Sequence, residues 1–260
     1  MLLLFHTVKT AKMKILIKII KWLLIAIVAL LIVGFIALKV VSEDRPAAIP
    51  NSDPDAVANE MLVALNKPAW DSLKYLKWEF MRGHQFLWDK QGNNALVKWD
   101  NIKVVLDLDK VSGVAYKDGN QVDGDIKNKL IQEAWSHWCN DSFWMFAPFK
   151  VFDKGTSRSI VETGNDQKGL MITYETGGVT PGDSYLWLLD NQNIPTGYKM
   201  WTFIPVKGMH MTWEGWKTLK GGAKVAVSHK SAALSFDMKD VAEGGSPAEL
   251  GYSNNIFDNF

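Results

Sequence analysis

The sequence predicts an α+β domain carried behind a single N-terminal transmembrane helix. Three observations lead to this fold class. An uncharged apolar run near the N-terminus is long enough to cross a bilayer. After residue 74 apolar and polar residues alternate, which is typical of strands, and short turn sequences separate the alternating segments. Two segments with helical spacing accompany them. We therefore expect about eleven antiparallel strands and two main helices in the domain.

The apolar run extends from Trp22 to Leu38, seventeen residues without a charge. About 20 residues cross a hydrocarbon core of roughly 30 Å, and the run reaches this length if Lys21 and Lys39 extend toward the headgroups. Five lysines precede the run, and the acidic sequence SEDR follows it. The positive-inside rule therefore predicts a cytoplasmic N-terminus and an exported remainder.

A cleaved signal peptide is the alternative interpretation of this segment. The length of the run, and the lack of a clean Ala-x-Ala sequence before Glu43, favour an uncleaved anchor. We expect a single-pass protein of the inner (cytoplasmic) membrane whose C-terminal domain lies in the periplasm.

Composition limits the function of the exported part. The chain has 260 residues, of which 47% are apolar, and it contains twelve tryptophans and one cysteine. Six of its 29 basic residues lie in the first 41 positions, so 23 basic and 28 acidic residues remain after them, a net charge of −5. Such a domain is a poor nucleic-acid binder, because phosphate binding depends on clustered Lys and Arg. One cysteine excludes an internal disulfide framework.

Four segments follow from these patterns: a cytoplasmic tail and anchor at 1–41, a linker at 42–53, a β-rich domain at 54–243 and an irregular tail at 244–260. The linker is rich in Pro, Asp and Ser. Asp53 before Pro54 predicts a helix N-terminus, and the apolar spacing that follows predicts a helix near 54–66 that ends at Pro68.

Strands are expected after this helix, and one further helix interrupts them. Leu76, Trp78 and Phe80 alternate with polar residues, and the turn sequences KQGNN (90–94) and KDGN (117–120) suit hairpins. Apolar residues four apart, from Ile126 to Trp138, predict a helix capped by Asp125 that ends at the stretch CNDSFWMFAPFK (139–150).

Two short motifs resemble the LolA-like superfamily of outer-membrane lipoprotein-sorting domains. In that family a strand reading Tyr-x-hydrophobic-x-hydrophobic-Asp precedes a turn with Pro and the next strand of a curved sheet. The second motif is similar to a Pro-Phe-Lys…Asp-Gly element of uncharacterised envelope relatives. The residues that carry the resemblance are Tyr185, Trp187, Leu189, Asp190, Pro195 and Tyr198 for the first motif, and Pro148, Phe149, Lys150, Asp153 and Gly155 for the second.

The resemblance covers roughly residues 55–240. It implies a curved, unclosed β-barrel with helices as a lid over a concave apolar face, and a face of this kind holds lipoprotein acyl chains or other hydrophobic ligands. The family has no catalytic residues, so the resemblance implies none in this chain. One departure is the anchor: the family's soluble carrier is released after signal cleavage, whereas this chain is expected to stay tethered. A tethered protein cannot cross an envelope, so its cavity would serve handover at the membrane or be filled by its own side chains.

We therefore expect a non-enzymatic protein that binds a lipid, an acyl chain or another hydrophobic ligand in an apolar cavity, without cofactor or metal. Large aromatic residues are the candidates for its lining, although for any one of them a place in the ordinary core is favoured, and only the whole set indicates a cavity. These candidates are Trp88, Trp99, Phe143, Trp144, Phe146, Trp187 and Trp201.

Two other functions remain open. One is an envelope hydrolase, glycan- or metal-dependent, that uses carboxylates near tryptophans. Its candidate carboxylates are Asp183, Asp190 and Glu214, and its candidate metal ligands, which show no paired spacing, are His84, His137, Cys139, Asp141, His210 and His229. The other is a scaffold whose sheet edge or tail SNNIFDNF (253–260) binds a protein partner. Catalysis by Cys139 is disfavoured, since His137 two residues away points elsewhere on a helix.

Overall fold

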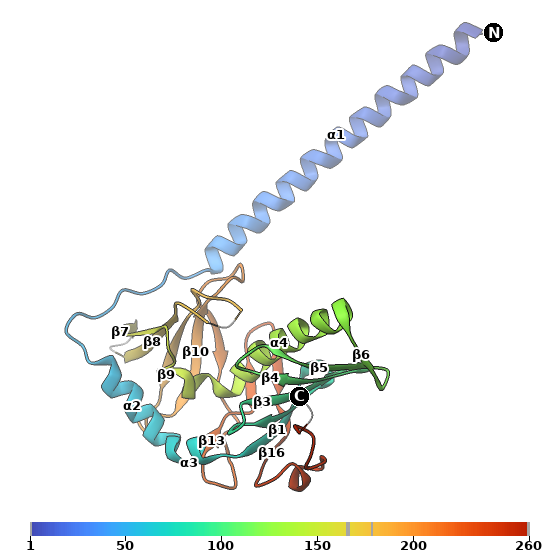
Figure 1. Ribbon diagram of the computed structural model, residues 1–260. Coiled ribbons are helices and arrows are strands. Elements are labelled where there is room, and N and C mark those ends of the chain that lie inside the picture. The colour runs from blue at the N-terminus through green and yellow to red at the C-terminus, as the bar shows by residue number, and fades with distance from the viewer. Residues whose placement is uncertain (1, 165–166, 178, 259–260) are drawn as a thin grey trace.

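A computed structural model describes residues 2–164, 167–177 and 179–258 of this chain, and it confirms the α+β class. A long N-terminal helix projects away from a β-rich domain (Figure 1). The α-helices are α1 (Leu2–Val41), α2 (Pro54–Ala64), α3 (Lys67–Ser72) and α4 (Gly124–Phe146), and the 3-10 turns are η1 (Met81–Gly83), η2 (Ala147–Lys150) and η3 (Ala248–Leu250).

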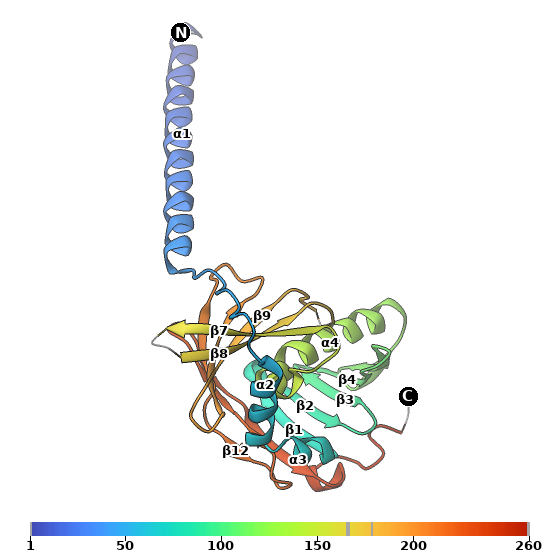
Figure 2. The ribbon, with the colours of Figure 1, turned by 90° about the vertical axis from the view of Figure 1, so that its left-hand side faces the viewer.

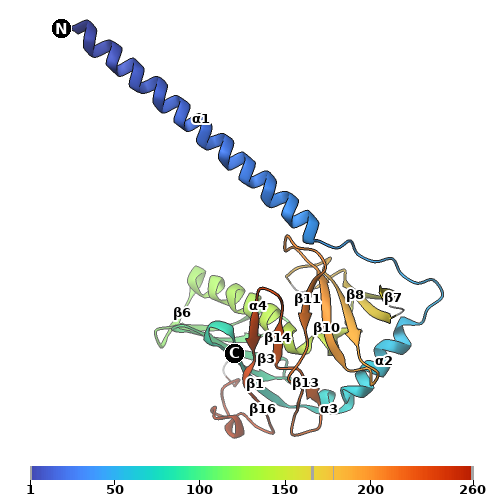
Figure 3. The same ribbon diagram turned by 180° about the vertical axis from the view of Figure 1, so that it is seen from behind.

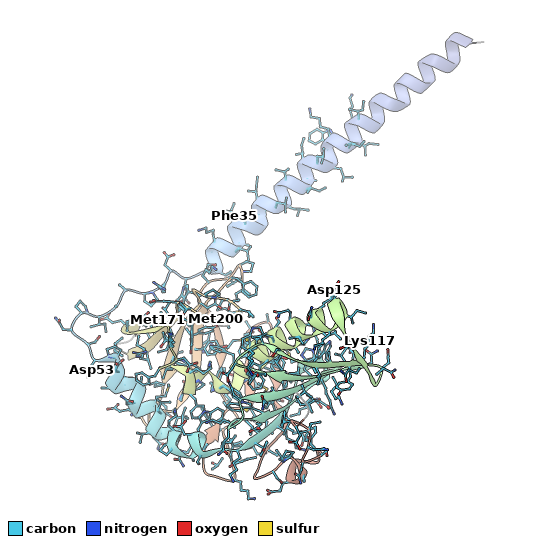
Figure 4. All side chains as sticks on the ribbon, viewed as in Figure 1. Phe35, Asp53, Lys117, Asp125, Met171 and Met200 are labelled. Carbon is cyan, nitrogen blue, oxygen red and sulfur yellow. The ribbon has the colours of Figure 1, made fainter. Side chains whose placement is uncertain are left out.

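Helix α1 is long and apolar enough to span a membrane. Its segment Ile17–Val41 has 25 residues, a mean hydropathy of 3.0 and no buried side chains. At 1.5 Å per residue this segment is about 37 Å long, more than the hydrocarbon core requires. Phe35 points outward from the last turns of α1, close to the domain (Figure 4).

Helix α2 begins as the sequence predicts. Asp53 is its N-cap, and the side chain accepts a hydrogen bond from the Ala56 N–H at 3.0 Å. The helix ends earlier than expected, with Leu65 as C-cap, and Pro68 does not terminate it. Pro68 instead lies in the first turn of the short helix α3, where proline needs no N–H partner.

Replacing Asp53 with alanine should lower the free energy of unfolding by about 1 kcal/mol, because the substitution removes an N-cap hydrogen bond. The measurement is urea denaturation of the intact chain in mild detergent. Asp44→Ala, at an exposed linker position outside the helix, is the control and should change the free energy by less than about 0.5 kcal/mol. Equal effects of the two substitutions would contradict the capping role.

The larger sheet is antiparallel and has seven strands. Its order is β16-β1-β2-β3-β4-β5-β6, so the last long strand of the chain pairs with the first (Figure 2). The sheet does not close into a barrel, since β16 and β6 remain its two edges within the described residues. Its strands are β1 (Tyr75–Phe80), β2 (His84–Asp89), β3 (Asn94–Trp99), β4 (Ile102–Asp107), β5 (Ser112–Lys117), β6 (Asn120–Val122) and β16 (Lys239–Gly244).

The remaining long strands form a second antiparallel sheet in the order β11-β10-β9-β8-β7. Seen from behind, this sheet stands beside the first and close to the end of α1 (Figure 3). Its strands are β7 (Thr156–Gly164), β8 (Gln167–Tyr174), β9 (Ser184–Leu189), β10 (Pro195–Trp201) and β11 (Met209–Thr212). Short two-stranded ribbons follow, made of β12 (Lys217–Thr218) with β13 (Lys224–Val225) and of β14 (Ser228–Lys230) with β15 (Ser235–Asp237).

Helix α4 differs from its prediction at both ends. Its N-cap is Asp123, and Asp125 lies inside the first turn, where a carboxylate favours the positive end of the helix dipole. The helix does not end near Trp138 but continues to Phe146, and η2 follows directly. The stretch that begins at Cys139 is therefore mostly helical.

Three apolar clusters hold these layers together. The main core lies between the two sheets and α4, and Met200 belongs to it. Met171, on the same five-stranded sheet, belongs to a smaller outer cluster with Val161 and Leu186 (Figure 4). The third cluster lies on the outer face of the seven-stranded sheet, where Leu250 and the C-terminal segment cover it.

The segment predicted as a linker binds to the outer face of the five-stranded sheet. Ala48 forms a β-bridge with Val161, and the Ile49 N–H donates to the Ile160 carbonyl at 2.8 Å. Nearer the anchor, the Trp201 indole N–H donates to the Glu43 carbonyl at 2.8 Å. These contacts leave little free chain between the membrane helix and the domain.

The C-terminal tail also packs on its own domain. Phe257 stacks near Tyr75 with ring centroids 6.5 Å apart, and Ile256 contacts the same outer cluster. In the described part of the tail these apolar side chains are therefore half-buried rather than displayed for a partner. The last two residues of the predicted docking segment, Asn259 and Phe260, lie outside the described residues.

Candidate functional site: a groove beside helix α4

A groove of about 990 Å³ runs along the C-terminal half of α4. On one side it is lined by α4 residues such as Phe143 and Trp144, and on the other by Tyr185, Met200 and further residues of the five-stranded sheet. Loops that follow β8 and β10 continue the lining. The lining is mixed: large apolar and aromatic side chains alternate with many polar and charged ones.

Aromatic side chains fill the space deeper between the layers. Trp70 and Phe149 stack with ring centroids 4.1 Å apart, and Trp78 stacks on Phe86 at 4.8 Å. Phe146 contacts Trp70, Trp78 and Trp88, so the rings form one connected cluster. This part of the domain is core, and the space open to a ligand lies at the groove.

The seven predicted lining residues fall into two groups. The first group lines the groove, with Phe143 and Trp144 partly exposed and the other two buried: Trp88, Phe143, Trp144 and Phe146. The second group lies elsewhere. Trp187 is fully buried against Tyr198 and Trp213, Trp99 packs edge-on against His137, and Trp201 belongs to the outer cluster under the linker.

The groove has an exposed apolar rim formed by Val179, Phe203 and Leu234. These side chains are 45%, 79% and 45% exposed, and all three line the groove. Phe203 lies in the loop between β10 and β11. Lys207 in the same loop donates its N–H to the Ser42 hydroxyl at 3.1 Å and accepts the Glu43 N–H at 2.9 Å. The loop that carries Phe203 therefore lies next to the end of α1, as Figures 1 and 3 also show.

Asp183 is the buried carboxylate of the groove. Its Oδ2 accepts hydrogen bonds from the Thr180 hydroxyl at 2.7 Å and the Tyr185 hydroxyl at 3.3 Å. Burial raises the pKa of Asp183, and these hydrogen bonds partly offset the shift. Burial, together with the Asp183 charge, also raises the pKa of Tyr185, so its hydroxyl stays a neutral donor. The pair gives the groove a polar end that can orient a bound headgroup.

Cys139 lacks the environment of a reactive thiol. It is half-buried on α4, and burial raises its pKa to about 12. A nucleophilic cysteine instead needs a lowered pKa and an adjacent base. The geometry supports the interpretation of Cys139 as a packing residue.

Each of the three carboxylates considered for a hydrolase site has hydrogen-bond or ion-pair partners of its own. Asp190 accepts the N–H groups of Gln192 and Ile194 at 2.8 and 2.9 Å, so it caps a turn. Glu214 pairs with Lys230 at 3.2 Å, and Asp183 belongs to the groove. Each carboxylate thus has a local structural role.

A cluster of titratable side chains that sequence patterns did not pair lies where α4 meets β2, and one of its members, His137, also lines the groove. His84 comes from the start of β2, and His137 and Asp141 come from successive turns of α4. The His84 Nδ1 lies 2.7 Å from the Asp141 Oδ2. Burial lowers the pKa of His137 and raises that of Asp141.

The other candidate ligands do not join this cluster, whose ligand atoms lie within 4.8 Å of one another. Only the spacing of four between His137 and Asp141, which places both on one helix face, offered a sequence signal. The spacing has this meaning only if the helix continues past Trp138 to Asp141. The predicted helix ended before Asp141, so the pair was not recognised.

Comparisons with known proteins do not assign this chain to a family. No protein-family model matches the chain, and no curated protein matches it.

Proposed function

We propose that this protein is a membrane-anchored component of the cell envelope that binds a lipid, a lipoprotein acyl chain or another hydrophobic ligand along the groove beside α4. One observation carries the proposal: the loop that carries the exposed rim residue Phe203 is hydrogen-bonded, through Lys207, to the residues that directly follow the apolar helix. A ligand leaving the bilayer at this point would meet the groove first.

The exposure of Phe203 supports contact between the rim and lipid. A phenylalanine that leaves water gains roughly 1.5–3 kcal/mol, so a side chain 79% exposed in water is better placed at a membrane interface. The docked segment 42–49 keeps the loop near the anchor. We infer that the rim inserts between headgroups and opens the groove toward the acyl region.

Burial of a chain in the groove would supply the binding energy. Each CH₂ contributes about 0.8 kcal/mol, so ten buried methylenes would contribute roughly 8 kcal/mol before the entropic cost of binding. Asp183 and the hydroxyl of Tyr185 would orient the polar end by hydrogen bonds. The proposed role is binding rather than catalysis, and it requires no cofactor.

The resemblance to LolA-like domains fits this role. We propose that the curved sheets act as the apolar wall, that α4 acts as the lid, and that the domain lies in the periplasm with its N-terminus in the cytoplasm. The tether then restricts the protein to handover at the inner membrane. A freely diffusing carrier would need to lose α1.

Photocrosslinking in nanodiscs would test the proposal on the intact chain. The discs contain a phospholipid with a diazirine on a sixteen-carbon chain, and mass spectrometry maps the adducts after illumination. We expect adducts on groove residues such as Phe143 and Met200, as well as on α1, which serves as an internal positive control. Adducts confined to α1 would overturn the proposal.

Two matched substitutions sharpen the test. Phe203→Glu places a charge on the rim and should lower the groove adducts about tenfold, since about 1.4 kcal/mol of lost insertion energy corresponds to a factor of ten. Phe152→Glu makes the same change at a phenylalanine that is 40% exposed and does not line the groove. This control should leave the groove adducts unchanged, and an equal loss in both variants would contradict a specific entry at the rim.

A further inference from the structure

The cluster of His84, His137 and Asp141 brings together two imidazoles and a carboxylate from distant parts of the chain. His137 and Asp141 lie one turn apart on α4, so both face the start of β2, where His84 lies. One ligand atom of each residue lies within 4.8 Å of the other two. The side chains of His84 and Asp141 are only 14% and 4% exposed, so the cluster is largely shielded from water.

The carboxylate is held in place from two sides. Its Oδ2 faces the His84 Nδ1 at 2.7 Å, and its Oδ1 accepts a hydrogen bond from the Asn140 side chain at 2.8 Å. A carboxylate oriented by an outer hydrogen bond is the arrangement that metal sites use to fix their ligands. The His84–Asp141 contact alone, however, is also consistent with a simple hydrogen bond between helix and sheet.

The hydrogen bond between His84 and Asp141 does not account for the buried position of the His137 side chain. Its Nε2 is buried and has no hydrogen-bond partner within the described residues. Its ring lies 4.2 Å from the His84 ring and 5.0 Å from the Trp99 ring, measured between centroids. A buried polar atom without a partner costs free energy, and a bound metal ion or an ordered water molecule would satisfy it.

We propose that His84, His137 and Asp141 bind one divalent transition-metal ion of the zinc class. Two imidazoles and one carboxylate suit Zn²⁺ and its neighbours, whereas Mg²⁺ and Ca²⁺ prefer oxygen ligands throughout. Three protein ligands leave a fourth position for water or a bound molecule. The inference does not rest on the proposed hydrophobic ligand. His137 also lines the groove, but His84 and Asp141 do not, and the metal is tested by its own binding.

Binding requires the three ligand atoms to move, and a pair as far apart as 4.8 Å must close by about 1.5 Å. Two ligand atoms about 2.0–2.1 Å from one tetrahedral zinc lie roughly 3.3 Å apart, so the His84–Asp141 contact of 2.7 Å must open by about half an ångström. When the His84 Nδ1 serves as ligand, its lone pair must face the metal, so a neutral ring takes the tautomer with its hydrogen on Nε2. A doubly protonated ring keeps that hydrogen and releases the Nδ1 proton to solvent as the metal–nitrogen bond forms. The ion would tie α4 to β2 one turn before the groove residues Phe143 and Trp144.

Metal titration of the intact chain tests the inference. The protein is purified in mild detergent with an affinity tag that lacks histidine, treated with a chelator and titrated with Zn²⁺ by calorimetry. We expect one ion per chain. Co²⁺ should give a saturable visible absorption that Zn²⁺ abolishes, a readout that needs no variant. Absence of saturable one-to-one binding would overturn the proposal.

Two variants locate the site. His137→Gln should weaken zinc binding about 100-fold while leaving the His84–Asp141 hydrogen bond intact. The control His210→Gln removes an exposed histidine outside the cluster and should leave the affinity unchanged. The metal-free His137→Gln protein should keep the thermal midpoint of the metal-free wild type, and only the wild type should gain stability on addition of Zn²⁺. Equal zinc affinity in the two variants would contradict the assignment.

Discussion

Replacing Trp187 with alanine should lower the free energy of unfolding by about 3–5 kcal/mol, the range for truncating a fully buried tryptophan. Trp187 is 0% exposed, and its ring contacts Trp213 at 5.0 Å and Tyr198 at 5.2 Å. Alanine would leave a large cavity between rings that are themselves buried. The measurement is urea denaturation of the intact chain in detergent, monitored by near-ultraviolet circular dichroism.

Two control substitutions show whether the loss of stability comes from the buried ring of Trp187. Phe203→Ala removes a side chain that is 79% exposed, and it should change the free energy by less than about 0.5 kcal/mol. Trp187→Phe keeps most of the ring and removes an indole N–H without a partner in the described structure, so it should cost less than half as much as alanine. A loss below about 1 kcal/mol for Trp187→Ala would mean that the residue lines an open cavity, as the sequence allowed.

Acidification from pH 7 to pH 5 should lower the free energy of unfolding by about 2 kcal/mol through His229 alone, and by about 3 kcal/mol near pH 4. His229 is 0% exposed, and burial lowers its pKa from 6.5 to about 4. The backbone carbonyls of Thr212 and Trp144 oppose this shift only in part. Above pH 6.5 the ring is neutral in both states, and its contribution to stability is complete.

The sign follows from proton uptake. Between pH 6.5 and about 4 the unfolded chain binds a proton at His229 and the folded chain does not, so stability falls as pH falls. The Nδ1 is positioned to donate to the Thr212 carbonyl at 3.2 Å, while the Nε2 faces the aromatic core, with the Trp213 ring centroid at 4.3 Å. A charged ring there would lose its hydration without an adequate partner.

Urea denaturation at a series of pH values measures this effect. The His229→Gln variant should lose most of the slope between pH 7 and pH 5, whatever its absolute stability. The control His210→Gln, at an exposed histidine whose pKa partial burial also lowers, should lose much less of the slope than His229→Gln. His137, whose pKa burial also lowers, contributes in the same direction, so a small residual slope is expected. An unchanged slope in His229→Gln would show that the folded protein accommodates the charged ring.

Much of the local structure could be predicted because it depends on neighbours in the chain. The apolar run of α1, the Asp53 cap and the hairpin turns at 90–94 and 117–120 follow from hydropathy, capping and turn chemistry. The alternation of Leu76, Trp78 and Phe80 matches the buried face of β1. The end of α4 could not be located, because a helix can continue wherever tertiary packing covers its apolar face.

The candidate site was predictable only in part. Phe143, Trp144 and Phe146 line the groove, whereas Trp187, on another element, is fully buried in the core. Alternation along a strand tells which residues share a face, and it does not tell whether that face meets side chains or open space. The cluster of His84, His137 and Asp141 depends on β2 meeting the second half of α4, which no local pattern specifies.

The sequence by itself determined the membrane-spanning length of α1, the α+β class and the hairpins at 90–94 and 117–120, because periodicity and turn chemistry act over a few residues. Only the tertiary structure decided that the strands divide into two sheets, that β16 pairs with β1, and that residues 42–49 bind to the second sheet. It also decided which of the tryptophans are buried and which meet solvent. These choices depend on contacts between residues far apart in the chain, whose free energy is set by how all the apolar faces pack together.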